Sequence, residues 1–228
     1  MDNTARMIRL LGRLRREMNG AVAESMRYYG RDYGLNYGVS IPTIRSIARA
    51  EGCDHEFARY LYVQQVRELR LAALHIADPA AAEIGETDFW AAGIINSEVA
   101  EEAAFAFLSR AAWLPEIFGV WCSAGAYGGE EVCGGATRSE LLAYAALMSG
   151  ARARIVRTEP SACDTAVHVV GRYPHSRLVA QGAAALLGGA LDAGDISRGE
   201  ALRLVASLPE NDAAAYVADE MSWRMEEH

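Results

Sequence analysis

The sequence has few of the features that mark secreted or disulfide-rich proteins. Its 228 residues begin Met-Asp-Asn-Thr-Ala-Arg, without the apolar h-region of a secretory signal. The four cysteines lie far apart and form no short Cys pairs: Cys53, Cys122, Cys133 and Cys163. We therefore expect reduced and mostly buried thiols in a cytoplasmic protein.

Metal, phosphate-loop and nucleophile motifs are also missing. Cys122 and Cys133 have no second pair of ligands, and His168 and His175 do not share one helix face across Pro174. The Gly-rich stretch 125–135 lacks the Lys-Ser/Thr ending of a phosphate-binding loop and carries two acids, so it is predicted to connect repeats flexibly. No Ser or Cys sits in a nucleophile elbow. The sequence predicts no metal and no cofactor.

One apolar run, 111–129, contains Glu116 as its only charge. Pro115 near its start, the glycines near its end and the missing basic flanks favour a core helix followed by a loop over a membrane span. The net charge of −8 means that any phosphate-binding surface must be a local patch on an acidic protein.

Helical periodicity runs through the chain, and strand-like alternation appears nowhere convincingly. Apolar residues from Met7 to Met18 recur at the spacing of a buried helix face, with an arginine stripe nearly opposite. Similar patterns predict further helices at 55–63, 68–77, 99–109, 139–148, 165–172, 178–191 and 197–207, with a last one from 213 towards 223.

Helix starts and breaks support this division. Thr137 with Glu140 and Ser197 with Glu200 have the spacing of capping boxes, and prolines separate the short helices. Short helices joined by turns are typical of stacked pairs that bury their apolar faces only against neighbouring pairs. We predict an all-α, HEAT-like helical-repeat solenoid in which 1–228 is one domain and the concave surface is the working face.

Two stretches carry a family resemblance: Tyr37-Gly-Val-Ser-Ile-Pro-Thr-Ile-Arg-Ser-Ile-Ala48 and Arg67-Glu-Leu-Arg-Leu-Ala-Ala-Leu-His-Ile-Ala77. The first resembles an aromatic-Gly turn that leads through a proline into an arginine-bearing helix of the DNA alkylation repair family. The second resembles the Arg-Glu helix that follows it. Catalytic members of that family are monofunctional glycosylases that remove cationic alkylated purines from duplex DNA bound in the concave groove.

The resemblance implies a catalytic carboxylate at Glu101, because the family's aspartate beside a Trp-rich helix start stabilises the sugar cation. Here Asn96 and Ser97 replace the paired tryptophans, and Tyr144 replaces a groove arginine. A later Trp and Arg pair is replaced by the Leu-Leu-Gly-Gly of 186–189. The alternative is a solvated helix face, capped by Asn96, on which Glu101 and its neighbour Glu102 point to water.

Repulsion between Glu98 and Glu102 at an i,i+4 spacing suggests a cationic partner, Arg67 or Arg70. Trp90 is the tryptophan expected to contact a ligand, whereas Trp113, Trp121 and Trp223 fit the packing between repeats. The candidate phosphate-binding arginines, each of which also fits a solvated face, are Arg6, Arg9, Arg13, Arg16, Arg45, Arg152, Arg154 and Arg157.

Three functions remain open from the sequence. The first is a non-catalytic or much diverged family member that binds nucleic acid or a protein partner along its groove. The second is an alkylpurine DNA glycosylase that acts on duplex DNA with Glu101 as its carboxylate. The third is a protein-interaction scaffold without DNA contact, and no membrane association is expected for any of the three.

Overall fold

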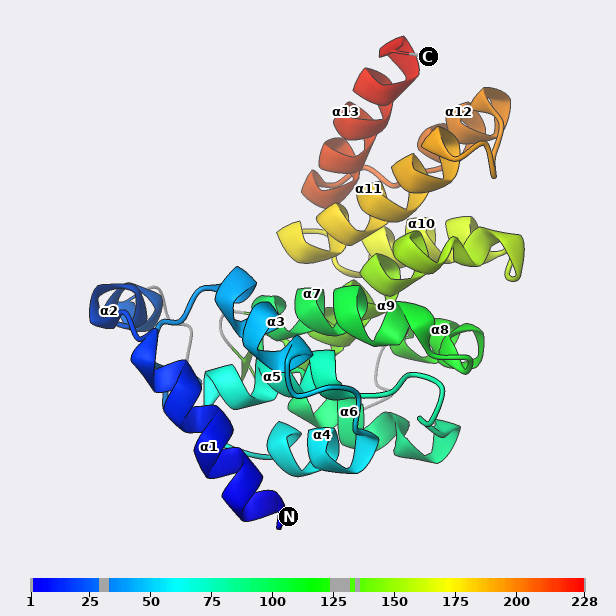
Figure 1. Ribbon diagram of the computed structural model, residues 1–228. Coiled ribbons are helices and arrows are strands. Elements are labelled where there is room, and N and C mark those ends of the chain that lie inside the picture. The colour runs from blue at the N-terminus through cyan, green and yellow to red at the C-terminus, as the bar shows by residue number, and fades with distance from the viewer. Residues whose placement is uncertain (1, 29–32, 124–131, 134–135, 228) are drawn as a thin grey trace.

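A computed structural model describes residues 2–28, 33–123, 132–133 and 136–227, and the regular secondary structure of this part of the chain is almost entirely helical (Figure 1). The first helices are α1 Asn3–Arg16, α2 Gly20–Tyr28, α3 Ile41–Arg49, α4 His55–Tyr62, α5 Arg67–Ile76, α6 Thr87–Gly93 and α7 Ser97–Ala106. They are followed by α8 Leu114–Cys122, α9 Arg138–Ala153, α10 Ala162–Arg172, α11 Arg177–Asp192, α12 Arg198–Ala206 and α13 Asp212–Glu227.

Short elements complete the fold. Three single turns of 3₁₀ helix are Ile84–Glu86, Leu108–Arg110 and Ile155–Arg157. The strands β1 Val132–Cys133 and β2 Ala136–Thr137 pair antiparallel just before α9. The all-α fold class is confirmed, and this ladder is the one strand pair in the described residues.

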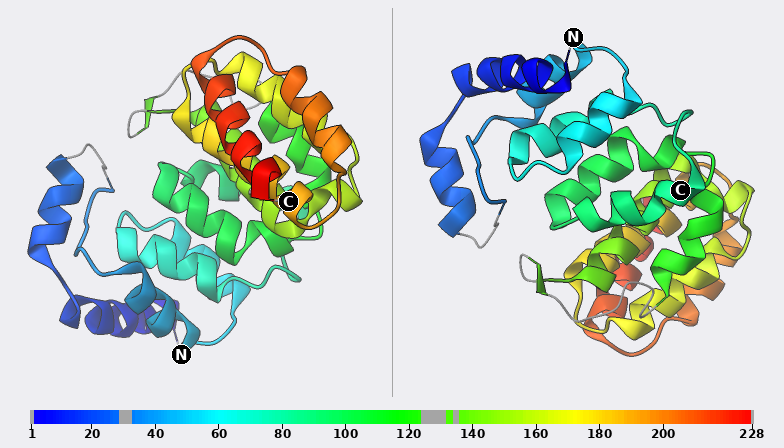
Figure 2. Two further views of the ribbon diagram at one scale, coloured as in Figure 1. Left: turned by 90° about the horizontal axis from the view of Figure 1, so that it is seen from above. Right: turned by 90° about the horizontal axis from the view of Figure 1, so that it is seen from below.

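The helices stack in two rows. The inner row is α3, α5, α7, α9, α11 and α13, in which each helix packs against the next. The outer row contains α4, α8, α10 and α12, which pack against α5, α9, α11 and α13 respectively. In the views of Figure 2 the chain follows a curved path from α1 and α2 round to α13, and the inner row lies on the inside of that curve. This is the HEAT-like solenoid expected from the sequence.

Local chemistry sets the helix boundaries as expected. Both capping boxes form: Thr137 accepts from the amide of Glu140, and Ser197 accepts from that of Glu200, while each glutamate returns a bond to the cap residue. Asn96 caps α7 by accepting from the amide of Val99 at 3.0 Å. Each cap satisfies an amide that the helix itself leaves without a partner.

Buried charges join the two segments that carry the family resemblance. The Glu68 carboxylate accepts hydrogen bonds from the amides of Tyr37 and Val39, and the Arg67 guanidinium donates to the carbonyl of Val39 at 2.8 Å. Gly38 has a φ of 70°, and a Cβ atom there would collide with the carbonyl oxygen of Asn19. The aromatic-Gly turn therefore needs glycine for both conformation and space.

The structure corrects several boundaries. The helix predicted at 139–148 extends to Ala153, so residues 150–153 form the last turn of α9. The helices α2 and α6 were not predicted, because each is short and lacks a regular apolar stripe. The core helix predicted in the apolar run is α8. Of the Gly-rich stretch 125–135 that follows it, residues 125–131, 134 and 135 lie outside the described residues.

Among the cysteines, Cys122 and Cys163 are buried and Cys53 is exposed, while the side chain of Cys133 lies outside the description. Burial raises the pKa of the Cys163 thiol to about 11, so that thiol stays protonated near neutral pH. None of the helices within the described ranges is both long and apolar enough to cross a membrane.

Candidate nucleic-acid interface on the inner row

Glu101 lies exposed on α7, and the hydroxyl of Tyr144 from α9 donates to its Oε1 at 2.9 Å. Burial and the neighbouring Glu101 charge together raise the pKa of Tyr144, so the phenol remains a neutral donor. The carboxylate is therefore held by one neutral hydroxyl. Tyr144 stands at the position where the family resemblance implies an arginine in the groove.

The other two acids of α7, Glu98 and Glu102, are paired with basic side chains. Glu98 accepts from Arg67 through both carboxylate oxygens, at 2.8 Å from Nε and 2.7 Å from Nη2. The prediction that Arg67 or Arg70 neutralises Glu98 is thus confirmed for Arg67. Its alternative, Arg70, instead donates at 3.4 Å to the carbonyl of Gln64.

Glu102 is buried, so the expectation that it points to water is wrong. It pairs with Arg45 from α3 and with Nε2 of His75 from α5, the latter at 2.6 Å. Burial alone would raise the pKa of Glu102, but the hydrogen bonds from His75 and Arg45 outweigh it and lower that pKa. Glu102 therefore ties three successive helices of the inner row together.

One turn beyond Glu101, two guanidinium groups contact the ring of Phe105. Arg45 reaches it from α3 with its Cζ 4.1 Å from the ring centroid, and Arg152 from α9 with its Cζ at 4.3 Å. The ring of His75 lies 6.2 Å away. We call Arg45, Phe105 and Arg152 the arginine–phenylalanine cluster. It brings together two of the predicted phosphate-binding residues from opposite flanks of α7.

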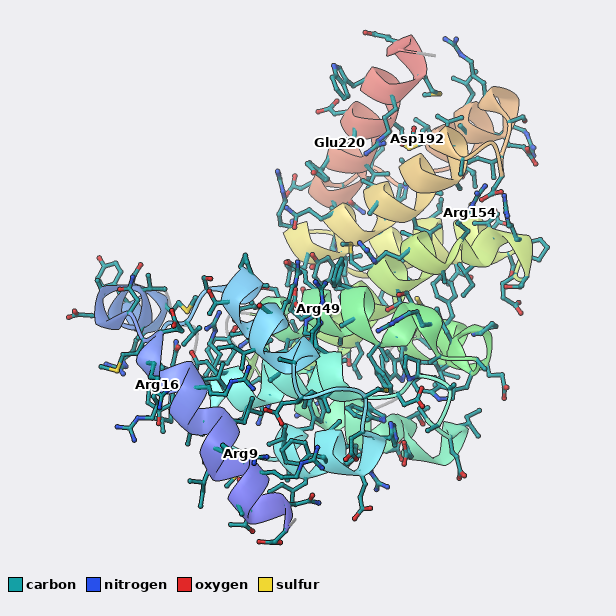
Figure 3. All side chains as sticks on the ribbon, viewed as in Figure 1. Arg9, Arg16, Arg49, Arg154, Asp192 and Glu220 are labelled. Atoms are coloured by element: carbon teal, nitrogen blue, oxygen red, sulfur yellow. The ribbon has the colours of Figure 1, made fainter. Side chains whose placement is uncertain are left out.

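The cations of the cluster differ in their partners. Arg45 is fixed by Glu102, whereas Arg152 is exposed and, within the described residues, has the Phe105 ring as its one partner. Arg49 adds an exposed guanidinium in the last turn of α3 (Figure 3). The inner row thus presents three arginines: Arg45 and Arg152, which contact the Phe105 ring, and Arg49, which lies one turn after Arg45 on α3.

The arginines of α1 do not form one stripe. Arg6 pairs with Asp54 at 2.6 Å and lies over the ring of Phe57, and Arg13 pairs with Glu51 at 2.7 Å. Arg9 and Arg16 are exposed along the helix (Figure 3). Two of the four predicted phosphate contacts are therefore used to dock α1 against α3 and α4.

Arg154 and Arg157 are also occupied. Both pair with Asp195 near the end of α11, Arg154 through two bonds of 2.7 Å and Arg157 through one of 2.8 Å. Hydrogen bonds from Arg154 and then Arg157 lower the pKa of Asp195 to about 2, so this acid stays charged. Figure 3 places Arg154 on the side of the molecule away from Arg9 and Arg16. The predicted group 152, 154 and 157 is split, and Arg152 alone joins the cluster.

Trp90 lies in the hydrophobic core, so the prediction that it contacts a ligand is corrected. It exposes 1% of its surface, and its ring centroid lies 4.3 Å from that of Phe107 and 4.8 Å from that of Tyr62. Its carbonyl accepts from the Tyr62 hydroxyl at 3.0 Å. Trp90 therefore packs from within α6 into the core and lines no groove.

Sequence reasoning missed Phe105, His75 and Arg49. A signal for Phe105 existed, because a residue four positions after Glu101 shares its helix face. The approach of Arg45 and Arg152 could not be read from spacing, since they come from different repeats. Within the described residues no group of three or more His, Cys, Asp or Glu side chains could hold a metal ion.

Comparisons with known proteins agree with this architecture. Residues 10–112 match the family model of the DNA alkylation repair enzyme, so the resemblance is confirmed over that range, which contains Glu101 and Phe105. Curated protein sequences give no match. A solved structure described as "A new family of proteins related to the HEAT-like repeat DNA glycosylases with affinity for branched DNA structures" is similar, with a TM-score of 0.69 and 16% identity. The alignment covers 98% of this chain and 95% of that one, and at this identity the likeness establishes the fold.

Proposed function

We propose that this protein binds branched DNA along its inner row and does not excise bases. The observation that carries the proposal is the arginine–phenylalanine cluster, in which Arg45 and Arg152 from separate repeats meet at Phe105. Cations that converge from different helices form a local patch that an acidic chain needs for phosphate contact.

The type of cation fits this role. The chain contains 22 basic residues and no lysine, so every cation available for a phosphate is a guanidinium. The planar guanidinium binds phosphate oxygens in pairs and stacks on aromatic rings, which an ammonium does less well. Arg152 already stacks on Phe105 and is exposed, so phosphate binding would not need to break an ion pair.

The surroundings of Glu101 favour binding over catalysis. A carboxylate stabilises a developing sugar cation most strongly in a preorganised site that excludes water. Glu101 is exposed, Ser97 stands one turn before it, and the nearest candidate tryptophan, Trp90, is buried. Water screens such a carboxylate, and its one bond comes from Tyr144.

Branched DNA is preferred over duplex because of the structural neighbour. That protein is described as having affinity for branched DNA structures, and its fold extends over almost the whole of this chain. A curved solenoid can contact two DNA arms at once when they diverge from a junction. The proposal for this chain combines that geometry with the residues of its own cluster.

The test is fluorescence anisotropy with a labelled four-way junction and a duplex of equal length, in a series of salt concentrations. If Arg49 and Arg152, whose guanidinium groups have no ion-pair partner among the described residues, each neutralise one phosphate, the logarithm of the affinity should fall with the logarithm of the salt concentration with a slope of about −1.8. Arg152→Ala should weaken binding and reduce the slope by about 0.9. Arg198→Ala, an exposed arginine at the start of α12, is the matched control and should change neither.

A second measurement is the release of free base from methylated duplex DNA by wild type and by Glu101→Gln. We expect no release from either. Release that the substitution abolishes would show a glycosylase with Glu101 as its carboxylate and overturn the non-catalytic proposal. Absence of salt-dependent binding to any DNA would overturn the nucleic-acid assignment in favour of a protein scaffold.

A further inference from the structure

We propose that Phe105 is a stacking platform for an unpaired base at the branch point, uncovered when Arg152 leaves the ring for a phosphate. This inference rests on the proposed function and specifies its substrate as a junction with unpaired nucleotides. The Phe105 ring is partly exposed, whereas the rings of Phe57, Phe107 and Phe118 are buried in the core.

The ring is held from one flank and covered loosely from the other. On the α3 side, Arg45 is fixed by Glu102, which His75 also binds, so this guanidinium keeps its position against the ring. On the α9 side, the guanidinium of Arg152 stacks on Phe105 and makes no hydrogen bond or ion pair to any described residue. The two contacts therefore differ in how easily each is broken.

A DNA phosphate competes for Arg152. An exposed cation–π contact is weak, while a guanidinium–phosphate bond is charge-assisted and commonly bidentate. When Arg152 turns to a phosphate, the ring face that it covered becomes open. The fixed Arg45 keeps the ring in orientation, so the platform does not collapse into the core.

An unpaired base is the group that fits the open ring. Bases within a duplex are covered on both faces by their neighbours, but an unpaired nucleotide at a branch point can leave the stack. Stacking on an aromatic side chain contributes to single-strand binding with little dependence on base identity. Of the acids near the ring, Glu102 is paired with Arg45 and His75, and Glu101 accepts a hydrogen bond from Tyr144. An uncharged base, unlike a phosphate, is not repelled by these carboxylates.

The experiment uses a three-way junction with 2-aminopurine at an unpaired branch nucleotide, and the same junction fully paired. Wild type should quench the fluorescence on binding, because stacking quenches this base analogue. Phe105→Leu should abolish the quenching and weaken binding of the unpaired junction by about tenfold or more. Its affinity for the fully paired junction should stay within about twofold, since Arg49 and Arg152 remain. Phe105→Tyr, which keeps the ring, should restore both.

Arg152→Ala separates the platform from the phosphate contact. It should weaken binding to both junctions, yet at saturating protein the quenching should persist because the ring is already open. Circular dichroism of each variant confirms that the helices form. Junction binding in which Phe105→Leu and wild type quench alike overturns the platform and leaves the proposed function standing. Failure of wild type to bind either junction overturns the proposed function itself.

Discussion

Removing the Glu68 carboxylate should destabilise the protein more than any single surface change. Glu68 exposes 0% of its surface and accepts from the amide of Tyr37 at 3.1 Å, the amide of Val39 at 3.2 Å and Nη1 of Arg67 at 3.1 Å. In Glu68→Ala the two amides lose their acceptor inside the protein. Arg67, which exposes 1%, keeps its bonds to Glu98 and is not left without a counter-charge.

The magnitude follows from these contacts. A buried donor without a partner costs about 1–3 kcal/mol, and removing one member of a buried ion pair costs about 3–5 kcal/mol. Because Arg67 retains Glu98, we expect a loss of roughly 3–5 kcal/mol for the whole substitution rather than the sum of these figures. With an urea dependence of about 2 kcal/mol per molar, the unfolding midpoint should fall by about 2 M.

The assay is equilibrium urea unfolding followed by far-ultraviolet circular dichroism. Glu56→Ala, an exposed acid in the first turn of α4, is the control and should change the free energy of unfolding by less than about 0.5 kcal/mol. Glu68→Gln keeps one acceptor and should fall between the two. A midpoint for Glu68→Ala that equals that of the control would refute the argument that this carboxylate holds the turn before α3.

Three further outcomes are expected. The pKa values of Asp54 and Glu102 are lowered in the folded state, so the stability that their charged forms contribute is full above the ordinary carboxyl pKa of about 4.3 and is lost as the pH falls below it. Urea unfolding midpoints measured from about pH 6 to pH 3 should show this loss of stability, and Glu102→Gln should show a smaller loss. Gly38→Ala should lower the thermal unfolding temperature, because its φ is positive and its space is filled; an unchanged temperature would show that the turn can relax. Arg154→Ala should leave junction affinity within about threefold, because the Arg154 guanidinium is already ion-paired with Asp195. Fluorescence anisotropy should show a larger loss of affinity for Arg152→Ala; a larger loss for Arg154→Ala would assign the phosphate contact to Arg154 instead.

The fold was predictable because its signals are local. Apolar residues at three- and four-residue spacing mark the helices, and the capping boxes at Thr137 and Ser197 mark two of their starts. The partner of Glu98 was also accessible from sequence. Like charges at i,i+4 in a folded helix require neutralisation, and the resemblance placed an arginine-bearing helix beside it.

The site was less predictable because its chemistry depends on distant pairings. Arg152 and Arg154 stand two positions apart in sequence, yet one stacks on Phe105 and the other pairs with Asp195. Nothing in the local sequence distinguishes them, since the partners lie on other helices. Likewise, Trp90 is an aromatic residue near the start of a family-like helix, and only the tertiary packing shows that its ring is buried while that of Phe105 is partly exposed.

The acidic balance of the chain does not oppose a cationic inner row, because charge acts over a limited distance. At physiological ionic strength the Debye length is about 8 Å, so acids on other faces are largely screened from a phosphate at the cluster. The nearest buried acid, Glu102, fixes Arg45 and thereby orients it instead of removing it from the surface. At low salt, where the Debye length grows to about 30 Å, the net charge of −8 should repel DNA before contact. The affinity should therefore rise less steeply on dilution of salt than two phosphate contacts alone would give, which is how an acidic DNA-binding protein differs from a basic one.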